Sequence, residues 1–405
     1  MRIAILGAGN TGTCAALELA GRGHHVDLYD QSDAPVRMAS FHNEGKVHVG
    51  ILYAKDRSLR TAELMIRGAL AFAPLLDRWV GFDSSRLQIS TPFHYGVHNG
   101  TMVSMDELKA HYAKCQRLFH DLHVASGQRY LGVDQSLQIE ELNASEMDSL
   151  VSREYFVAMF RTSERAVDPR TVAALLREAA LANPRIHGVW GARISAVNII
   201  DGGRLAVSFR KDGEDYVEAY DQVANTLWHG RLSIDATMGL GQEHPWMYRY
   251  KFANRVLVPI DGEIPSITCV LGPFGDIVNY GTNGLFLSWY PEGMIATSRA
   301  LEPPDWESEL TPERRHEVFR RSYEAWMERC PPLRALRFRP SDADPGGGII
   351  FAWGDTGVDD PESMLHERFE IGVHSYGNYH TVNTGKYTMT PWMGMKTAER
   401  ILGVS

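Results

Sequence analysis

The first thirty residues constrain the fold of this chain most strongly. Residues 2–6 (RIAIL) form a short apolar run, which is typical of a buried parallel strand. A glycine-rich turn from Gly7 to Gly12 follows, and an Ala/Leu-rich helix continues to Gly21. A second strand over residues 25–29 then ends on Asp30. This order of strand, turn, helix, strand and acid predicts the opening unit of a doubly wound α/β sheet.

Each residue type in this turn has a separate physical reason. Glycine permits the tight turn, lets a pyrophosphate approach the backbone, and lets the helix lie close to the sheet. The free N–H groups of the helix then face the pyrophosphate. Asp30 can accept hydrogen bonds from ribose hydroxyls and would repel a 2′-phosphate. A turn that binds nothing is the alternative, but the complete unit predicts dinucleotide binding by Gly7, Gly9, Asn10, Thr11, Gly12, Asp30 and Gln31.

Length, charge and cysteine spacing limit the remaining possibilities. The 405 residues suggest two domains, and a net charge of -9 without a Lys/Arg cluster disfavours a nucleic-acid partner. The first strand starts at residue 2, and no apolar run is long enough to span a bilayer. We therefore expect a cytoplasmic protein without a membrane span. No metal site is expected, because C-x-x-C spacing is absent from Cys14, Cys115, Cys269 and Cys330.

Beyond Asp30 the chain departs from the alternation expected of an NAD-binding fold. Residues 38–53 are polar and glycine-spaced, and a long amphipathic helix follows over residues 59–79. A cofactor longer than one nucleotide, with its far end at this segment, explains the departure. Further along, the sequence predicts helices at 104–125, 169–182, 312–329 and 391–402, hairpins at 201–202 and 212–213, and a return strand at 222–227.

These motifs resemble those of the FAD-dependent oxidoreductases of the D-amino-acid-oxidase type, also called the glycine oxidase or sarcosine oxidase superfamily. Residues 43–53 (NEGKVHVGILY) are similar to the N-S-G-V-I-H-x-G-I-Y-Y run of L-2-hydroxyglutarate dehydrogenases. Residues 167–169 (VDP) match a helix start of that superfamily. Residues 385–388 (GKYT) are similar to the G-K-x-T of FAD-dependent glycerol-3-phosphate dehydrogenases. Residues 248–294 match no family motif.

The resemblance implies an α/β fold in which a Rossmann-like FAD-binding domain is interleaved with an antiparallel-sheet (α+β) substrate domain. We assign residues 1–85, 150–235 and 340–405 to the FAD-binding domain. Residues 86–149 and 236–339 form the expected substrate domain. The implied cofactor is FAD.

The resemblance also implies which residues meet the ribityl chain and the flavin. These are Ser40, Asn43, Gly45, Lys46 and Val47, together with Gly385, Lys386, Tyr387 and Thr388. The N-terminus of the last helix can stabilise negative charge on the reduced flavin. A rival segment is residues 349–355, an apolar run that ends in Gly354 and Asp355. We favour the later segment, because an apolar helix follows it.

His48 and Lys46 are the candidate catalytic residues. Histidine titrates near neutral pH, and oxidation of a hydroxyl carbon needs a proton acceptor, whereas oxidation of a neutral amine does not. The alternative is that His48 positions the loop and that Lys46 is a surface lysine. An arginine could clamp a substrate carboxylate. Candidate substrate-binding residues are therefore Arg249, Tyr250, Tyr280, Trp289 and Tyr290.

The expected activity is transfer of a hydride from a CH–OH or CH–NH carbon of a small molecule to flavin N5. The electron acceptor, oxygen or another carrier, stays open. A flavin monooxygenase is the alternative enzyme. The other alternative is a non-catalytic protein-binding relative, as the Rab GDP-dissociation inhibitors resemble this fold. The intact glycines and Asp30 disfavour that last interpretation.

Overall fold

A six-stranded sheet carries the N-terminal unit in the computed structural model of the protein. The structure describes residues 1–81, 86–132, 136–242, 244–260 and 263–404. The strand order is β21-β22-β12-β1-β2-β8, and neighbours are parallel except β21 and β22. The predicted return strand is confirmed as β12, which pairs with β1. The bounds are β1 Ile3–Leu6, β2 Val26–Asp30, β8 Ile186–Trp190, β12 Gln222–Asn225, β21 Gly372–Tyr376 and β22 Tyr379–Asn383.

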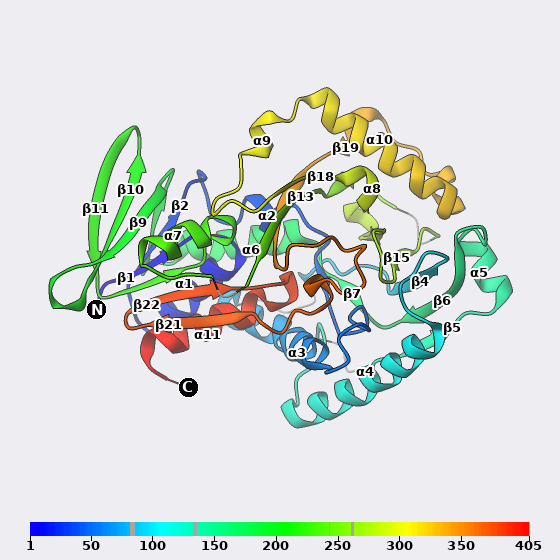
Figure 1. The fold of residues 1–405 in the computed structure, drawn as a ribbon, viewed down its shortest axis with the longest axis horizontal. Coiled ribbons are helices and arrows are strands. Elements are labelled where there is room, and N and C mark those ends of the chain that lie inside the picture. The colour runs from blue at the N-terminus through cyan, green and yellow to red at the C-terminus, as the bar shows by residue number, and fades with distance from the viewer. Residues whose placement is uncertain (82–85, 133–135, 243, 261–262, 405) are drawn as a thin grey trace.

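Helices from both ends of the chain pack around this sheet (Figure 1). The first and last helices pack directly on each other, since a Cβ on Gly394 would lie only 2.5 Å from Cys14 Cβ. The helices of this region are α1 (Asn10–Gly21), α2 (Met38–Phe41), α3 (Arg60–Val80), α6 (Pro169–Ala182), α7 (Arg231–Thr237) and α11 (Thr390–Leu402).

A second, eight-stranded sheet forms the opposite side of the molecule (Figure 1). Its neighbours are antiparallel except β15 and β4. In spatial order the strands are β19 (Ala343–Asp344), β14 (Asn254–Val256), β17 (Leu285–Trp289), β16 (Gly275–Asn279), β15 (Ser266–Cys269), β4 (Phe93–His98), β6 (Phe156–Thr162) and β5 (Ile139–Glu141). Its helices are α4 (Met105–Ser126), α5 (Ala144–Leu150), α8 (Tyr290–Gly293), α9 (Trp306–Glu309) and α10 (Pro312–Arg329).

Three small sheets complete the molecule. One is the predicted double hairpin, which lies at one end of the molecule beside the N-terminus (Figure 1). Its strands are β9 (Arg193–Ile199), β10 (Leu205–Lys211) and β11 (Glu214–Tyr220). The second contains β18 (Met294–Ser298), β13 (Trp246–Phe252) and β20 (Gly347–Trp353); the third pairs β3 (Lys46–Val47) with β7 (Arg165–Ala166).

The predicted helix starts are confirmed by their capping contacts. Ser104 and Glu107 form a reciprocal capping box at α4. Asp168 accepts a hydrogen bond from the Arg170 N–H ahead of α6, and Thr311 caps α10 with proline in its first turn. These side chains satisfy backbone N–H groups that have no partner within the helix. Local signals therefore place the helices correctly.

The chain crosses repeatedly between the two large sheets, as an interleaved arrangement requires. The strands of the six-stranded sheet fall in all three segments that we assign to the FAD-binding domain. Strand β6 also falls in the second of these segments, but it pairs with β4 and β5 in the eight-stranded sheet. Within the described ranges, no helix combines the length and the apolar character needed to cross a membrane.

Candidate functional site

The turn between β1 and α1 is fixed by close backbone contacts. Gly7 has a φ of 98°, a conformation that favours glycine. A Cβ on Gly12 would lie 1.9 Å from the Gly7 carbonyl oxygen, so a larger residue would push the helix away. The Asp30 carboxylate accepts hydrogen bonds from the N–H groups of Ala8 and Ser32, each at 2.8 Å. The acid at the end of β2 is therefore held beside the turn.

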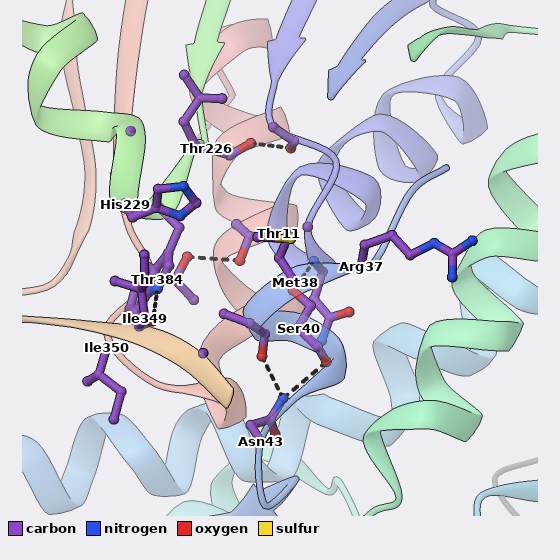
Figure 2. A pocket seen from close by; sticks show the side chains of 18 of the residues that line it. Thr11, Arg37, Met38, Ser40, Asn43, Thr226, His229, Ile349, Ile350 and Thr384 are labelled. Carbon is purple, nitrogen blue, oxygen red and sulfur yellow. Dashed lines mark hydrogen bonds between the residues drawn. The ribbon is translucent and has the colours of Figure 1, made fainter. Parts of the chain in front are cut away.

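A cavity of about 250 Å³ opens at this turn (Figure 2). Segments far apart in the sequence line it, including the 37–44 segment, residues 226–230, residues 348–350 of β20, and the turn before α11. Gly12, Gly45, Lys46, Val47 and Thr388 are not among its lining residues. The predicted residues that do line it are Gly7, Gly9, Asn10, Thr11, Asp30, Gln31, Ser40, Asn43, Gly385, Lys386 and Tyr387.

The polar groups around the turn suit a dinucleotide. Both polar atoms of the Asn10 carboxamide are buried beside the cavity; within the described ranges they make no hydrogen bond of good geometry, although the Tyr387 hydroxyl lies close to them. The Asn10 N–H itself donates to Ser40 Oγ at 3.0 Å. The hydroxyls of Thr11 and Thr384 are hydrogen-bonded at 2.8 Å, which joins α1 to the C-terminal turn (Figure 2). The Asn10 amide beside the helix N-terminus is a donor set that a pyrophosphate can use.

Thr388 joins the two segments that we expect at the flavin. Its hydroxyl accepts a hydrogen bond from the His48 N–H at 2.9 Å and donates to the Lys46 carbonyl oxygen at 3.1 Å. The 385–388 turn is therefore attached directly to the strand that follows Asn43. Of the rival segment, Ile349 and Ile350 line the cavity, whereas the Asp355 carboxylate lies 3.8 Å from the Arg299 guanidinium and is not among the lining residues.

Lys46 is buried and points toward the eight-stranded sheet. Its Nζ atom donates to Asp276 Oδ1 at 2.6 Å and to the Thr268 hydroxyl. Burial alone would lower the pKa of Lys46, but the carboxylates of Asp276, Glu164 and Glu44 outweigh it and raise the pKa above its ordinary value. A charged Lys46 thus ties β3 to strands β15 and β16, which makes it part of the frame behind the cavity.

His48 is also buried, with 2% of its surface exposed, and it is not among the cavity-lining residues. Its Nδ1 atom lies 3.6 Å from Glu164 Oε1, and its ring packs edge-on against Tyr53. Burial, the largest effect, lowers the pKa of His48, although Glu164 acts in the opposite direction. This placement favours the loop-positioning role of His48 over the role of proton acceptor.

The five predicted substrate residues are not among the residues that line the cavity. Arg249 donates to the carbonyl oxygens of Thr356 and Met247, at 2.7 Å and 3.4 Å, so its guanidinium is occupied. The Tyr280 hydroxyl donates to the Glu44 carbonyl oxygen. The other side chains pack elsewhere: Tyr250 bonds to Glu307, Trp289 lies against Trp326 and Arg329, and the Tyr290 ring lies under Lys251.

Three cations line the part of the cavity near β13 and the C-terminal turn: Lys251, Arg368 and Lys386. Burial, reinforced by the nearby Arg368, lowers the pKa of Lys386 to about 8. Burial alone would raise the pKa of the cavity-lining Glu44, but Lys251 and Lys386 hold it below its ordinary value. Within the described ranges, the Arg368 side chain makes no hydrogen bond or ion pair, and its Nε atom is buried without a partner.

Sequence reasoning missed Lys251 and Arg368. Lys251 is the next residue after the predicted Tyr250, and side chains alternate between the two faces of a strand, so a shift of one position would have found it. Arg368 lies in the 354–371 connection between β20 and β21, which contains no motif. The chain offers no local signal that this connection reaches the cavity.

A family model described as FAD dependent oxidoreductase (DAO) matches residues 2–400. The chain belongs to this family. FAD as the cofactor and an FAD-dependent oxidoreductase as the enzyme class are therefore confirmed. The residues at the turn fit FAD. The glycines leave the cavity open, Asp30 lies where it can bond to a ribose, and the Asn10 carboxamide can bond to a pyrophosphate.

Solved structures share the fold of this DAO-family chain. Glycine oxidase from Geobacillus kaustophilus has a TM-score of 0.68 at 13% identity, covering 100% of this chain and 95% of its own. Iminodiacetate oxidase from Chelativorans sp. BNC1 has a TM-score of 0.66 at 17% identity, with 100% and 96% covered. The predicted fold class is confirmed by this likeness, which at such identities shows the fold alone.

Sequence relatives match over a shorter stretch. D-amino acid dehydrogenase from Cereibacter sphaeroides is 35% identical over 116 residues, and that of Rhizorhabdus wittichii is 32% identical over 120 residues. The matched stretch covers 26% of this chain, and 26% and 27% of those two relatives. The chain thus matches only about a quarter of the length of these curated proteins.

Proposed function

We propose that the protein oxidises a small carboxylate-bearing amine, of the 2-amino acid type, at the carbon that carries the nitrogen. The single observation that supports this most is the Arg368 guanidinium, which lines the cavity beside Lys386 and makes no hydrogen bond or ion pair within the described ranges. Arg368 and Lys386 are partly buried, and with Lys251 they outnumber the neighbouring Glu44 carboxylate, so this part of the cavity favours a bound anion. The name of the sequence relatives, D-amino acid dehydrogenase, agrees with this substrate class.

The residues of the turn would hold the ADP half of FAD. Asp30 would accept hydrogen bonds from the ribose, and the backbone at Gly9 together with the Asn10 carboxamide would meet the pyrophosphate. Ser40, Asn43 and the turn at Gly385 to Tyr387 would surround the flavin. When bound, FAD supplies the acceptor for the hydride that leaves the substrate carbon.

Arg368 would bind the substrate carboxylate and so orient the carbon to be oxidised. A guanidinium can hold a carboxylate through two parallel hydrogen bonds, which fixes the direction of the substrate as well as its position. Lys386, with a pKa of about 8, would keep positive charge nearby at neutral pH. This arrangement provides the substrate clamp that we expected at Arg249.

The surroundings favour an amine over a hydroxyl as the group oxidised. Removing a hydride from a hydroxyl carbon needs a base for the O–H proton, whereas a neutral amine provides its own electron pair. His48 lies outside the cavity lining. His42 and His229 line the cavity, and burial lowers the pKa of both, which makes them weaker proton acceptors. Glu44 lines the cavity, but its lowered pKa makes it a weak proton acceptor.

Anaerobic bleaching of the bound flavin tests the proposal. The purified yellow protein is mixed with D- and L-amino acids, secondary amino acids and 2-hydroxy acids, and the flavin absorbance is followed. We expect amino acids to bleach the flavin and the corresponding hydroxy acids to leave it oxidised. Bleaching by hydroxy acids alone would contradict the choice of an amine.

Arg368→Gln provides the matched variant for this experiment. A charged hydrogen bond contributes about 1.5–3 kcal/mol, so the concentration of amino acid needed for half-maximal bleaching should rise about tenfold to a hundredfold. Arg249→Gln is the control, because Arg249 does not line the cavity and its guanidinium already bonds to the carbonyl oxygens of Thr356 and Met247. Equal effects of the two substitutions would remove Arg368 as the carboxylate clamp.

A further inference from the structure

A small second cavity lies next to the main one, and Arg368 lines both. Its volume is about 50 Å³, and Gly385 also belongs to the linings of both cavities. Strand β20 contributes to both, with residues 348–350 in the main cavity and residues 351–353 in the second. We refer to the second cavity as the recess.

The walls of the recess are mainly apolar, and its rim is acidic. The acidic residues are Glu367 and Glu370, which are both exposed. Although Glu367 is exposed, the partial loss of water around its carboxylate raises its pKa, and repulsion from Asp56 and Glu370 adds to this effect. The apolar wall consists of Phe351, Ala352, Trp353, Met364, Phe369 and Ile371.

The segment that closes the recess is attached at several points. The Trp353 indole N–H donates to the Glu370 carbonyl oxygen at 3.0 Å. The Arg368 N–H donates to the Thr61 hydroxyl at 2.9 Å, and the Arg60 guanidinium lies 4.1 Å from the centre of the Phe369 ring. These contacts come from both β20 and α3, so the wall is held in place without a ligand.

We propose that the recess receives the side chain of the substrate and limits it to a small apolar group. This inference rests on the proposed function, because the Arg368 guanidinium must hold the substrate carboxylate between the two cavities. A substrate held there has the main cavity on one side and the recess on the other. The carbon to be oxidised would then face the main cavity, and its substituent would enter the recess.

The size of the recess sets the limit. One water needs about 10–15 Å³ of such space, so a volume of about 50 Å³ accommodates roughly three or four non-hydrogen atoms. Side chains of the size of valine or leucine fill this volume, and an aromatic ring exceeds it. The carboxylates of Glu367 and Glu370 would repel an acidic side chain at the rim.

Unreactive carboxylic acids measure this preference without turnover. Acetate, propionate, butyrate, isovalerate and phenylacetate are titrated into the FAD-bound protein, and the change in flavin absorbance gives each Kd. Each buried carbon should tighten the Kd about fourfold. We expect the affinity to increase with each added carbon up to isovalerate and no further, so that phenylacetate binds no more tightly than propionate.

Substitutions in the apolar wall of the recess should either lower or raise the size of side chain that the recess accepts. Ala352 is buried in the wall, and Ala352→Leu should remove the gain in affinity for butyrate and isovalerate while the Kd of acetate changes less than twofold. Ile371→Ala enlarges the recess and should extend the gain to phenylacetate. Ala219→Leu, on β11 away from both cavities, is the matched control and should leave the series unchanged.

The outcomes distinguish the recess from the proposed function. Arg368→Gln should weaken every acid by the same factor, whatever its length. If Arg368→Gln weakens every acid equally but chain length and Ala352→Leu have no effect on the Kd, the proposal for the recess is overturned. The proposal that Arg368 binds the carboxylate then still holds. If no acid binds in an Arg368-dependent manner, the clamp and the recess are both overturned.

Discussion

At the scale of one residue, the pKa of Lys386 reports the free energy that it costs to bury this ammonium group. The folded protein lowers this pKa from 10.5 to about 8. Between these pH values the unfolded chain binds the proton and the folded chain does not, so stability rises with pH. Below pH 8 the folded state carries the whole cost, which corresponds to about 3 kcal/mol.

Lys386→Gln should therefore stabilise the FAD-free protein at pH 7, by about 1–3 kcal/mol. The advantage should shrink as pH rises through about 8 and vanish near pH 10.5. Thermal unfolding of both proteins across this range gives the comparison. Saturating isovalerate should narrow the difference at pH 7, since an anion offsets the charge. A variant that is less stable at pH 7 would show that the attraction between Lys386 and the Glu44 carboxylate outweighs the cost of burying the ammonium group.

His48 allows the positioning and proton-accepting roles to be separated. Its backbone N–H, not its ring, bonds to Thr388, so His48→Ala keeps the contact between the two flavin segments. We expect FAD to be retained, single-turnover flavin reduction to fall less than tenfold, and its pH profile to keep its shape. Loss of a base would instead cost about 10²–10⁴-fold and remove an inflection from the profile. Tyr53→Phe, next to the His48 ring, is the control.

At the residue scale, the sequence identified the cofactor side of the cavity better than the substrate side. The residues of the glycine-rich turn follow one another, so their spacing alone predicts where they lie. Lys251 reaches the cavity from strand β13 and Arg368 from the 354–371 connection, and only tertiary packing brings them together. Arginine and lysine are common on any protein surface, so the sequence around Arg368 and Lys251 does not indicate that they reach the cavity.

Single elements can also be tested, and the turn between β1 and α1 gives two contrasting substitutions. A Cβ on Gly9 would meet only Ser40 Oγ, at 3.1 Å, whereas a Cβ on Gly12 would lie 1.9 Å from the Gly7 carbonyl oxygen. Gly9→Val should thus fold normally and lose FAD, while Gly12→Ala should lower the melting temperature of the FAD-free protein as well. Flavin content and thermal unfolding are the measurements. Full FAD occupancy in Gly9→Val would mean that the turn is purely structural.

Elements with local signals were predictable, and those that depend on distant partners were not. Helices α4, α6 and α10 carry their caps in the sequence, and β1 and β2 flank a recognisable turn. By contrast, the two-residue strands β3 and β7 exist because Lys46 and Val47 pair with residues 165–166. A pair so short has no periodicity of its own.

At the scale of the whole molecule, one buried ion pair connects the cofactor side to the eight-stranded sheet. Lys46 and Asp276 are 230 residues apart in the chain, and their charged atoms lie 2.6 Å apart. Burial alone would raise the pKa of Asp276, but Lys46 and Lys251 hold it below its ordinary value. Lys251 is also a cavity residue, so the pair fixes a wall of the site together with the packing of the two sheets.

Removing one member of this pair should be more damaging than removing both. Lys46→Met leaves the partly buried Asp276 carboxylate with the Thr268 hydroxyl and with Lys251, whose Nζ atom lies 3.9 Å away, and should cost about 3–5 kcal/mol in unfolding free energy. The double variant Lys46→Met/Asp276→Leu should recover part of that loss, because the Asp276 carboxylate is removed together with its partner, whereas Glu164 and Glu44 still lose the Lys46 charge. Urea unfolding of the single and double variants measures the coupling, and flavin content shows whether the cavity survives. Strictly additive losses would mean that the two side chains stabilise the fold independently, and that the connection between the sheets lies elsewhere.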